Sequence, residues 1–201
     1  MNNVRFRSFY TVIVSLIADR GGDVMEYVRQ YSSPLGNMIM TSDGTALTGL
    51  WFEGQKYSGS GHEMASADET LTVFRDTARW LDTYFNGREP DFTPPLDANG
   101  TDFRREVWNI LLTIPYGHTM TYGEIAGIIA RKKGISRMSA QAVGGAVGHN
   151  PISIIIPCHR VMGLGGNLTG YGGGIQRKVK LLELENVDTS AFFIPKKGTA
   201  L

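Results

Sequence analysis

The chain has 201 residues, of which 42% are hydrophobic and 19% charged, and this length is enough for one good core or two small ones of about 80 to 100 residues each. Its twenty basic and nineteen acidic side chains leave a net charge of +1, which excludes nucleic-acid binding through overall charge and requires a local basic patch for any such binding. The single cysteine excludes an internal disulfide and a cysteine-rich zinc site, and it fits a reducing compartment, so a cytoplasmic location is expected.

Residues 1–24 differ from the rest of the chain. Their apolar stretch "FYTVIVSLIA" follows two arginines but is too short to span a bilayer, which needs roughly 20 residues. No small-residue cleavage site of a secretory signal follows it. The residues "GGDVM", which end at Met25, can be encoded by a purine-rich string that resembles a bacterial ribosome-binding site. We therefore predict that translation starts at Met25 and that residues 1–24 are a non-native segment, with a leader or anchor as the alternative.

Residues 25–87 are predicted to form an N-terminal α/β domain. The strand-like segments are 27–33, 36–43 and 45–53. A polar, glycine-rich loop at 54–66 precedes a helix at 67–87, where apolar residues recur at nearly 3.6-residue spacing. Segment 88–99 contains three prolines and no periodicity, so we predict a linker between two domains.

Residues 100–187 are expected to form a mainly helical domain, followed by a tail at 188–201. The predicted helices are 101–114, 121–134, 139–150 and 175–186. The second helix can be capped by Thr121, and the third, rich in small residues, begins at Ser139. Together they predict a helix-turn-helix. The basic residues of "ARKKGISR" are placed in the intervening turn, where a solvated loop is the alternative to a binding patch.

Cys158 follows the apolar segment "NPISIIIP", which is predicted to be a short buried strand over 150–157. A cysteine at the end of such a strand is commonly a packing residue. His159 could instead serve as a base and lower the pKa of the thiol. Because adjacent side chains point in different directions, we expect any coupling between the two to run through water. The loop "GLGGNLTGYGGG" at 163–174 is predicted to be flexible and unpacked, beside a pocket.

The string "IPCHRV", preceded by "IPYGHTMTYGEIA" and "GGAVGHNPISII", resembles the O6-alkylguanine-DNA alkyltransferases, or methylated-DNA–protein-cysteine methyltransferases. The resemblance covers residues 25–185 and is densest from Gly100 onward. It implies a ribonuclease-H-like α/β N-terminal domain and a mainly α C-terminal domain with a winged-helix-like helix-turn-helix. It also implies a DNA repair protein that flips O6-alkylguanine out of double-stranded DNA and transfers the alkyl group irreversibly, once per molecule, to its own cysteine. No metal, cofactor or membrane is implied, and a monomer is expected.

The resemblance assigns the catalytic roles. It makes Cys158 the alkyl acceptor and His159 a base that acts through a bridging water, with Glu185 orienting the imidazole. Tyr122 corresponds to a tyrosine that donates to guanine N3 and stabilises the charge developing on the leaving base. Asn150 corresponds to a hinge asparagine that holds the turn between the recognition helix and the active-site strand.

Further residues are expected to bind the substrate base and the DNA. The backbone carbonyls of Cys158 and Val161 would accept from the exocyclic amine of guanine, and Tyr171 would line the pocket. Gly172 stands where the family often has a serine, so a backbone N–H would hold O6 and the pocket mouth would be more open. Ser139, at the start of the recognition helix, is placed with the DNA-binding residues.

Gln141 stands where the family usually has the arginine that enters the base stack when the damaged base is flipped. Glutamine can fill the gap and hydrogen-bond, but it adds no attraction to phosphate. We expect Arg137 or Lys133 to supply that charge from the preceding turn.

Alternatives to this interpretation exist at two levels. Taken singly, Asn150 could be only a turn residue, Glu185 a solvated helix acid and Tyr122 a surface residue. For the whole chain, the alternatives are a non-catalytic sensor of alkylated DNA, a DNA-binding regulator and, more distantly, a cysteine hydrolase.

Overall fold

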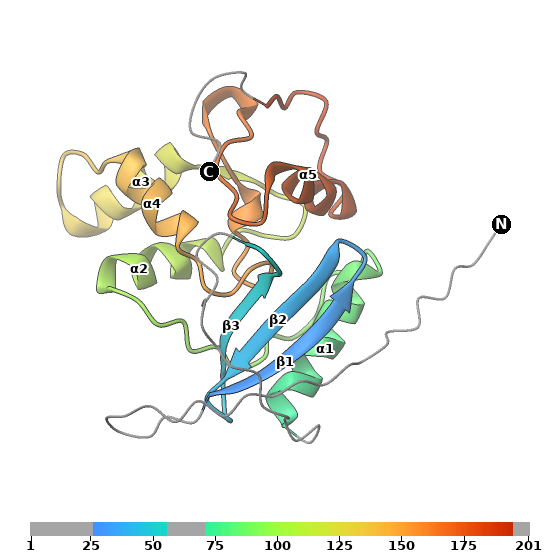
Figure 1. Cartoon of the computed structure of the whole chain (residues 1–201). Helices are drawn as coiled ribbons and strands as arrows, with labels where there is room; N and C mark the ends of the chain where they lie inside the picture. Colours follow the sequence, from blue (N-terminus) through green and yellow to red (C-terminus); the bar gives the residue numbers. More distant parts are fainter. Residues whose placement is uncertain (1–25, 56–70, 195–201) are drawn as a thin grey trace.

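The computed structural model describes residues 26–55 and 71–194 (Figure 1). The predicted start at Met25, the segment before it, most of the loop at 54–66 and the first residues of the helix predicted at 67–87 lie outside the described residues. Among the described residues, no helix combines the length and apolarity needed to cross a bilayer.

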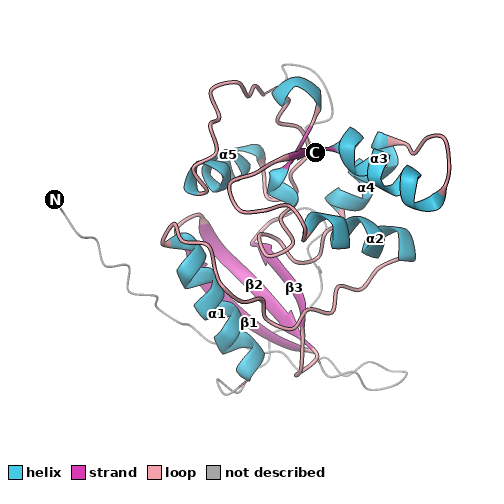
Figure 2. Cartoon of the chain, turned by 180° about the vertical axis from the view of Figure 1, so that it is seen from behind, coloured by secondary structure: helices cyan, strands magenta, loops and turns pink. Residues whose placement is uncertain are grey.

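The N-terminal half is a three-stranded antiparallel sheet with one helix packed on it. The strands are β1 (Tyr27–Ser33), β2 (Gly36–Ser42) and β3 (Leu47–Phe52), paired in that order. Helix α1 (Thr72–Phe85) covers one face and contacts all three strands, as Figure 2 shows from behind. The helix ends before Gly87, which has a φ of +72°. The predicted strands and helix are therefore confirmed over the described residues.

The C-terminal half is mainly helical, as predicted. Its helices are α2 (Asp102–Leu111), α3 (Tyr122–Lys133), α4 (Ala140–Gly148) and α5 (Ile175–Leu184), with 3-10 helices η1 (Cys158–Arg160) and η2 (Leu164–Gly166) and the short parallel strands β4 (Met120–Thr121) and β5 (Val161–Met162). The predicted cap at Thr121 is confirmed, and Ser139 caps the helix that is predicted to begin there. The Thr121 hydroxyl accepts from the backbone N–H of Glu124 in a complete capping box, and the Ser139 hydroxyl accepts from the N–H of Ala142.

The turn between α3 and α4 is less basic than predicted. Arg131, Lys132 and Lys133 all belong to the last turn of α3, where basic side chains face the negative end of the helix dipole. This leaves Arg137 as the basic residue of the turn itself. The helix ends at the glycine, because Gly134 is its C-cap in the left-handed conformation, with a φ of +64°.

The two halves share one continuous hydrophobic core, which extends from the sheet and α1 to Cys158 and α5. The edge of β3 joins them. Leu47 exchanges backbone hydrogen bonds with Pro95 and Asp97, and Leu50 does so with Pro151 and Ser153. Residues 95–97, within the segment 88–99, are therefore paired to the edge of β3, because an open strand edge gains from having its backbone groups paired.

The strand predicted over 150–157 is wrong. Ile152 makes only an isolated bridge to Leu50, and the chain then turns on itself, with the N–H of Ile156 bonded to the carbonyl of Ile152 at 3.1 Å. Ile154 has a φ of +70°, which no extended strand contains. The core surrounds this segment on all sides, so nearly all of its residues are apolar. Periodicity alone cannot distinguish such a buried turn from a buried strand.

The second part of the glycine-rich loop over 163–174 is packed, in contrast to the prediction, whereas Leu164 near its start is 90% exposed. Leu168 and Tyr171 are buried. A Cβ added at Gly170 would lie only 2.9 Å from the hydroxyl oxygen of Tyr122, and this glycine has a φ of +66°. Glycine here permits a close approach of the backbone and a left-handed conformation, rather than flexibility.

Candidate active site

Cys158 is the first residue of η1, and its side chain is buried, with 6% of the residue exposed. Asn150 holds it in place. The Asn150 Nδ2 donates to the Cys158 Sγ at 3.1 Å and to the Ile156 carbonyl at 2.8 Å, while its Oδ1 accepts from the Ile152 N–H at 3.0 Å. The same amide therefore closes the turn after α4 and hydrogen-bonds the thiol.

The thiol is neutral in its resting environment. Burial raises the pKa of Cys158, and this outweighs the hydrogen bond from Asn150 and the positive charge of Lys178, which lower it. A nucleophile at this position therefore needs a base to remove its proton during the reaction.

His159 is completely buried, and its ring orientation is fixed by Glu185. The Nε2 of His159 lies 2.7 Å from the Oε1 of Glu185. Because a carboxylate only accepts, Nε2 carries the proton and Nδ1 holds a lone pair. In the described part of the chain, Nδ1 has no hydrogen-bond partner. Burial lowers the pKa of His159 against the opposing effect of Glu185, so the ring is neutral and its Nδ1 is ready to accept a proton.

Glu185 lies just beyond the end of α5, with donors around both carboxylate oxygens. The Arg160 Nε donates to Oε2 at 2.9 Å and its Nη2 to Oε1 at 3.0 Å, and the Gly117 N–H donates to Oε2 at 3.1 Å. Burial alone would raise the pKa of Glu185, but the hydrogen bond from His159 and the hydrogen bonds and positive charge of Arg160 lower it to about 2. Arg160, for which the sequence suggested no definite role, is thus the buried counterion of the carboxylate.

Tyr84 completes this group and was missed by the sequence reasoning. Its hydroxyl donates to the Glu185 Oε1 at 2.7 Å and lies 3.3 Å from the His159 Nε2. Tyr84 belongs to α1, and the apolar spacing of that helix predicts only a core residue. No local pattern indicates a contact with a residue 101 positions later.

Lys178 was also missed. This buried residue of α5 donates from Nζ to the carbonyl of Val161 and, at 3.0 Å, to that of Thr169. Burial lowers the pKa of Lys178 to about 8, while the nearby Cys158 opposes this change. The sequence signal is its position, because Lys178 lies three residues after Ile175 and four before Leu182 and so falls on the apolar face of the helix, where lysine is rare.

Tyr122 and Tyr171 lie near the thiol. The Tyr122 hydroxyl is 3.2 Å from the carbonyl of Thr169 and 3.3 Å from that of Gly170. Burial, together with the nearby Cys158, raises the pKa of both tyrosines, so both hydroxyls stay protonated and can donate. Within the described residues, the buried hydroxyl of Tyr171 has no partner.

The backbone groups predicted to read the base are close to the thiol but already engaged. The carbonyl of Val161 accepts from Lys178, and that of Cys158 accepts from the Val161 N–H. Each carbonyl retains a second lone pair for a base. Gly172, half-buried beside Tyr171, sits in the same loop.

The predicted DNA-binding residues lie apart from this buried group. Gln141 is exposed in the first turn of α4, and Ser139 caps the same helix. Arg137 is exposed in the turn before it. The Nζ of Lys133 lies 2.9 Å from the Glu106 carboxylate, so its charge is already paired on the protein.

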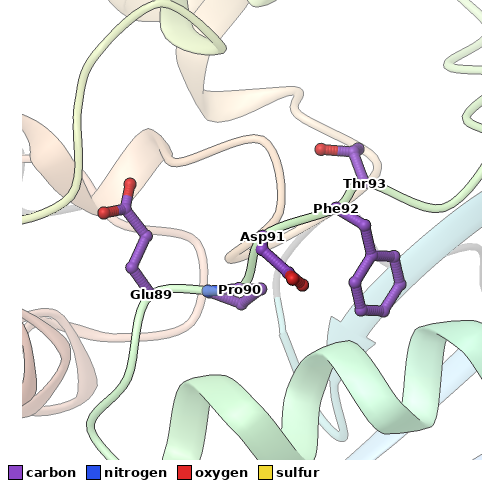
Figure 3. Close-up of a pocket in the computed structure, with 5 residues that line it drawn as sticks. All are labelled: Glu89, Pro90, Asp91, Phe92 and Thr93. Carbon is purple, nitrogen blue, oxygen red and sulfur yellow. The ribbon is translucent and has the colours of Figure 1, made fainter.

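Neither a metal site nor a second catalytic cluster competes with this one in the parts of the chain that are described. They contain no group of three or more His, Cys, Asp or Glu side chains placed to hold a metal. A hollow of about 510 Å³ is lined by consecutive residues of the segment between the two halves, Glu89 to Thr93, as Figure 3 shows. It contains none of the residues described above, and the ring of Phe92 is covered by Arg79 of α1.

The chain matches two domains of one family. Residues 27–98 match the 6-O-methylguanine DNA methyltransferase, ribonuclease-like domain, and residues 102–187 match the 6-O-methylguanine DNA methyltransferase, DNA binding domain. The predicted fold class, an α/β ribonuclease-like half followed by a helical DNA-binding half, is confirmed. The division into domains at 25–87 and 100–187 with a linker at 88–99 stays a prediction.

Individual relatives agree with this assignment. The methylated-DNA–protein-cysteine methyltransferase of Mycobacterium tuberculosis is 46% identical over 161 residues, which are 80% of this chain and 93% of the relative. The enzyme of the same name from Haemophilus influenzae is 43% identical over 162 residues, 80% of this chain and 87% of the relative.

Solved structures resemble the fold as well. The crystal structure of the M. tuberculosis O6-methylguanine methyltransferase aligns with a TM-score of 0.68 and 44% identity, covering 86% of this chain and 97% of that one. A crystal structure of the M. tuberculosis protein in complex with DNA aligns with a TM-score of 0.64 and 45% identity, covering 78% and 90%.

Proposed function

The chain belongs to the 6-O-methylguanine DNA methyltransferase family, and on this premise we propose that it repairs double-stranded DNA by transferring the alkyl group of O6-alkylguanine to Cys158. The observation that carries the proposal is the buried thiol beside a neutral imidazole, with the proton of that imidazole fixed on the far nitrogen by Glu185.

The relay begins at Glu185. This carboxylate holds the Nε2–H of His159, so Nδ1 accepts the thiol proton through a water molecule, and the resulting imidazolium is stabilised by the carboxylate. As the thiolate forms, the amide of Asn150 donates to the sulfur, and the positive charge of Lys178 opposes the cost of burying an anion.

The transfer forms one bond and breaks one. The sulfur of Cys158 attacks the alkyl carbon, the C–O6 bond breaks, and its electron pair remains on the guanine. The Tyr122 hydroxyl donates to guanine N3 and stabilises this charge, and the guanine regains its N1 proton from the relay and solvent. The product is a thioether, which water does not readily hydrolyse, so each molecule reacts once and needs no cofactor.

The damaged base reaches the buried thiol by leaving the duplex. We place α4 as the recognition helix, with Gln141 filling the space of the flipped base and Arg137 supplying charge toward phosphate. The flip costs a few kcal/mol, and less where alkylation has already weakened the pairing. The crystal structure of the M. tuberculosis relative in complex with DNA supports DNA as the partner of this chain. We further propose a monomer that acts in the cytoplasm, where a free thiol persists.

The proposal is tested by incubating the protein with a duplex that carries one O6-methylguanine, labelled in the methyl group. The expected result is one equivalent of label on the protein and an unmodified guanine in the DNA. Cys158→Ser should bind the duplex and take up no label. Binding of the damaged duplex by the wild type without uptake would support the sensor instead, and label retained by Cys158→Ser would overturn the assignment of the acceptor.

A further inference from the structure

The N-terminal half contributes a side chain to the active site of the C-terminal half. Tyr84 of α1 is completely buried and directs its hydroxyl at the Glu185 carboxylate, with an O–O distance of 2.7 Å to Oε1. The same hydroxyl lies 3.3 Å from the His159 Nε2. One oxygen of Glu185 therefore faces both the imidazole and the phenol.

The aromatic ring of Tyr84 is held firmly by its neighbours. It stacks on Trp80 with ring centroids 5.3 Å apart. The rings of Phe85, Tyr116 and His159 pack edge-on against it, with centroids 5.5, 6.0 and 6.3 Å from its own. Such packing leaves the hydroxyl little freedom to turn elsewhere. Burial and the charge of Glu185 raise the pKa of Tyr84 well above its usual value, so the phenol stays neutral and remains a donor.

A tyrosine hydroxyl has one proton to donate, and the carboxylate is its acceptor here. The Nε2–H of His159 donates to the same Oε1. Each donor reduces the negative charge available to the other. The strength with which Glu185 attracts the imidazole proton is therefore limited by the bond from Tyr84.

We infer that Tyr84 is a positioning residue of the alkyl transfer, which directs the Glu185 carboxylate at His159 and limits the basicity of that histidine. The inference rests on the proposed function and adds a residue from the other half of the molecule to it. It also gives the N-terminal half a chemical role, in addition to packing.

The charged and titratable groups that face His159 and Glu185 come from several elements. Arg160 of η1 and Lys178 of α5 are positive, Cys158 and Tyr116 are neutral, and Tyr84 comes from α1. Tyr84→Phe changes none of the others, and it removes a single oxygen atom. Any change in the pKa of His159 in this variant therefore measures the contribution of the Tyr84 hydroxyl.

The test is the rate of a single transfer as a function of pH. His159 must be neutral to accept the thiol proton, so the rate falls as the pH drops through its pKa. Without the Tyr84 hydroxyl, Glu185 favours the imidazolium more strongly and raises that pKa. In Tyr84→Phe we expect the acid limb to move to higher pH by about half a unit to one unit, which corresponds to one hydrogen bond.

Tyr116→Phe is the matched control. The Tyr116 hydroxyl donates to the backbone carbonyl of Leu184 at 3.0 Å, and its ring packs edge-on against Tyr84. This variant disturbs the same aromatic cluster without removing a bond to Glu185, so its acid limb should coincide with that of the wild type. A Tyr84→Phe protein that is slower by one factor at every pH, with an unmoved limb, would show that Tyr84 is only structural.

A second substitution covers the case in which Tyr84→Phe does not fold. Replacing Tyr84 by 3-fluorotyrosine makes the phenol a stronger donor, so the acid limb should move to lower pH. An unmoved or upward-shifted limb would overturn the inference. Alkyl transfer by the wild type separates the proposed function from the inference on Tyr84. If the wild type transfers the alkyl group, the pH profiles of the variants test Tyr84 alone. If it does not, the proposed function fails, and the role of Tyr84 in transfer fails with it.

Discussion

The buried residues around Glu185, which form the proposed relay, and α4, the proposed recognition helix, differ in how completely contacts within the protein fix their side chains. In the relay, Glu185 receives hydrogen bonds from His159, Arg160 and Tyr84, and these residues lie inside the shared core. On α4 and in the turn before it, Gln141 and Arg137 are exposed to solvent. The chemistry is therefore preorganised within the protein, whereas DNA binding depends on contacts that form only with the duplex.

Replacing His159 should produce the largest effect on the relay. In His159→Gln the base is lost while a hydrogen bond to Glu185 remains possible, so the single-transfer rate should fall by about 100- to 10,000-fold. Affinity for damaged duplex, measured by a gel shift, should stay within a few-fold of the wild type. A rate near the wild-type value would show that the reaction of the Cys158 thiol does not depend on this imidazole. The proposed role of His159 as the base would then be wrong.

Replacing Glu185 should destabilise the fold strongly. Glu185→Gln leaves the Arg160 guanidinium buried without its counterion, and the free energy of unfolding in urea should drop by about 3 to 5 kcal/mol. Glu106→Gln is the matched control, because its partners Lys132 and Lys133 are well exposed, and its effect should stay within about 1 kcal/mol. Similar losses in both variants would contradict a special role for the buried pair.

The same carboxylate makes stability depend on acid. The pKa of Glu185 is lowered from 4.5 to about 2, so its contribution is full above about pH 4.5 and is lost as the pH falls through 2. Unfolding free energies across this range should decline by about 3 kcal/mol on account of this group. Glu185→Gln should lack that part of the decline, and an identical slope in the two proteins would refute the assignment.

Substitutions on the proposed recognition helix should change DNA binding and leave the transfer step at Cys158 unchanged. Gln141→Arg should raise affinity for damaged duplex and make its logarithm fall more steeply with the logarithm of salt, by about one unit of slope. Gln141→Ala should slow the reaction with duplex because nothing fills the gap in the base stack. A Gln141→Arg protein with unchanged salt dependence would place this residue away from the DNA.

The smallest expected effect is a difference between Arg137 and Lys133 in how much each contributes to the salt dependence of DNA binding. Arg137→Ala should reduce the salt slope by about one unit, because its charge is free for phosphate. Lys133→Ala should change the slope less, because Lys133 is paired with Glu106 at 2.9 Å. Equal slopes in Arg137→Ala and the wild type would remove Arg137 from the interface.

The features that can be predicted from the sequence are those that depend on residues close together in the chain. Three features follow from short patterns and are confirmed: the cap at Thr121, the start of a helix at Ser139 and the end of α5 near Glu185. The catalytic roles came from the family resemblance, because spacing alone identified only the pair Cys158 and His159.

The features that the sequence did not predict depend on distant parts of the chain. Tyr84 and Glu185 meet across 101 positions, and Arg160 reaches Ile114 across 46, so no local periodicity carries the information. The apolar pattern over 150–157 predicts a strand, whereas the structure has a turn. A segment that the core covers on all sides is apolar at every position, so its sequence does not distinguish a buried turn from a buried strand.

In the proposed function, Cys158 and the buried relay perform the transfer, while α4 only delivers the base. The most direct measurement compares the rates at which an O6-alkylguanine free base and an O6-alkylguanine duplex alkylate Cys158. We predict that His159→Gln slows both reactions by the same factor, and that Gln141→Ala slows the duplex reaction alone. A Gln141→Ala protein slowed equally on the free base, or a His159→Gln protein slowed only on the duplex, would contradict the account.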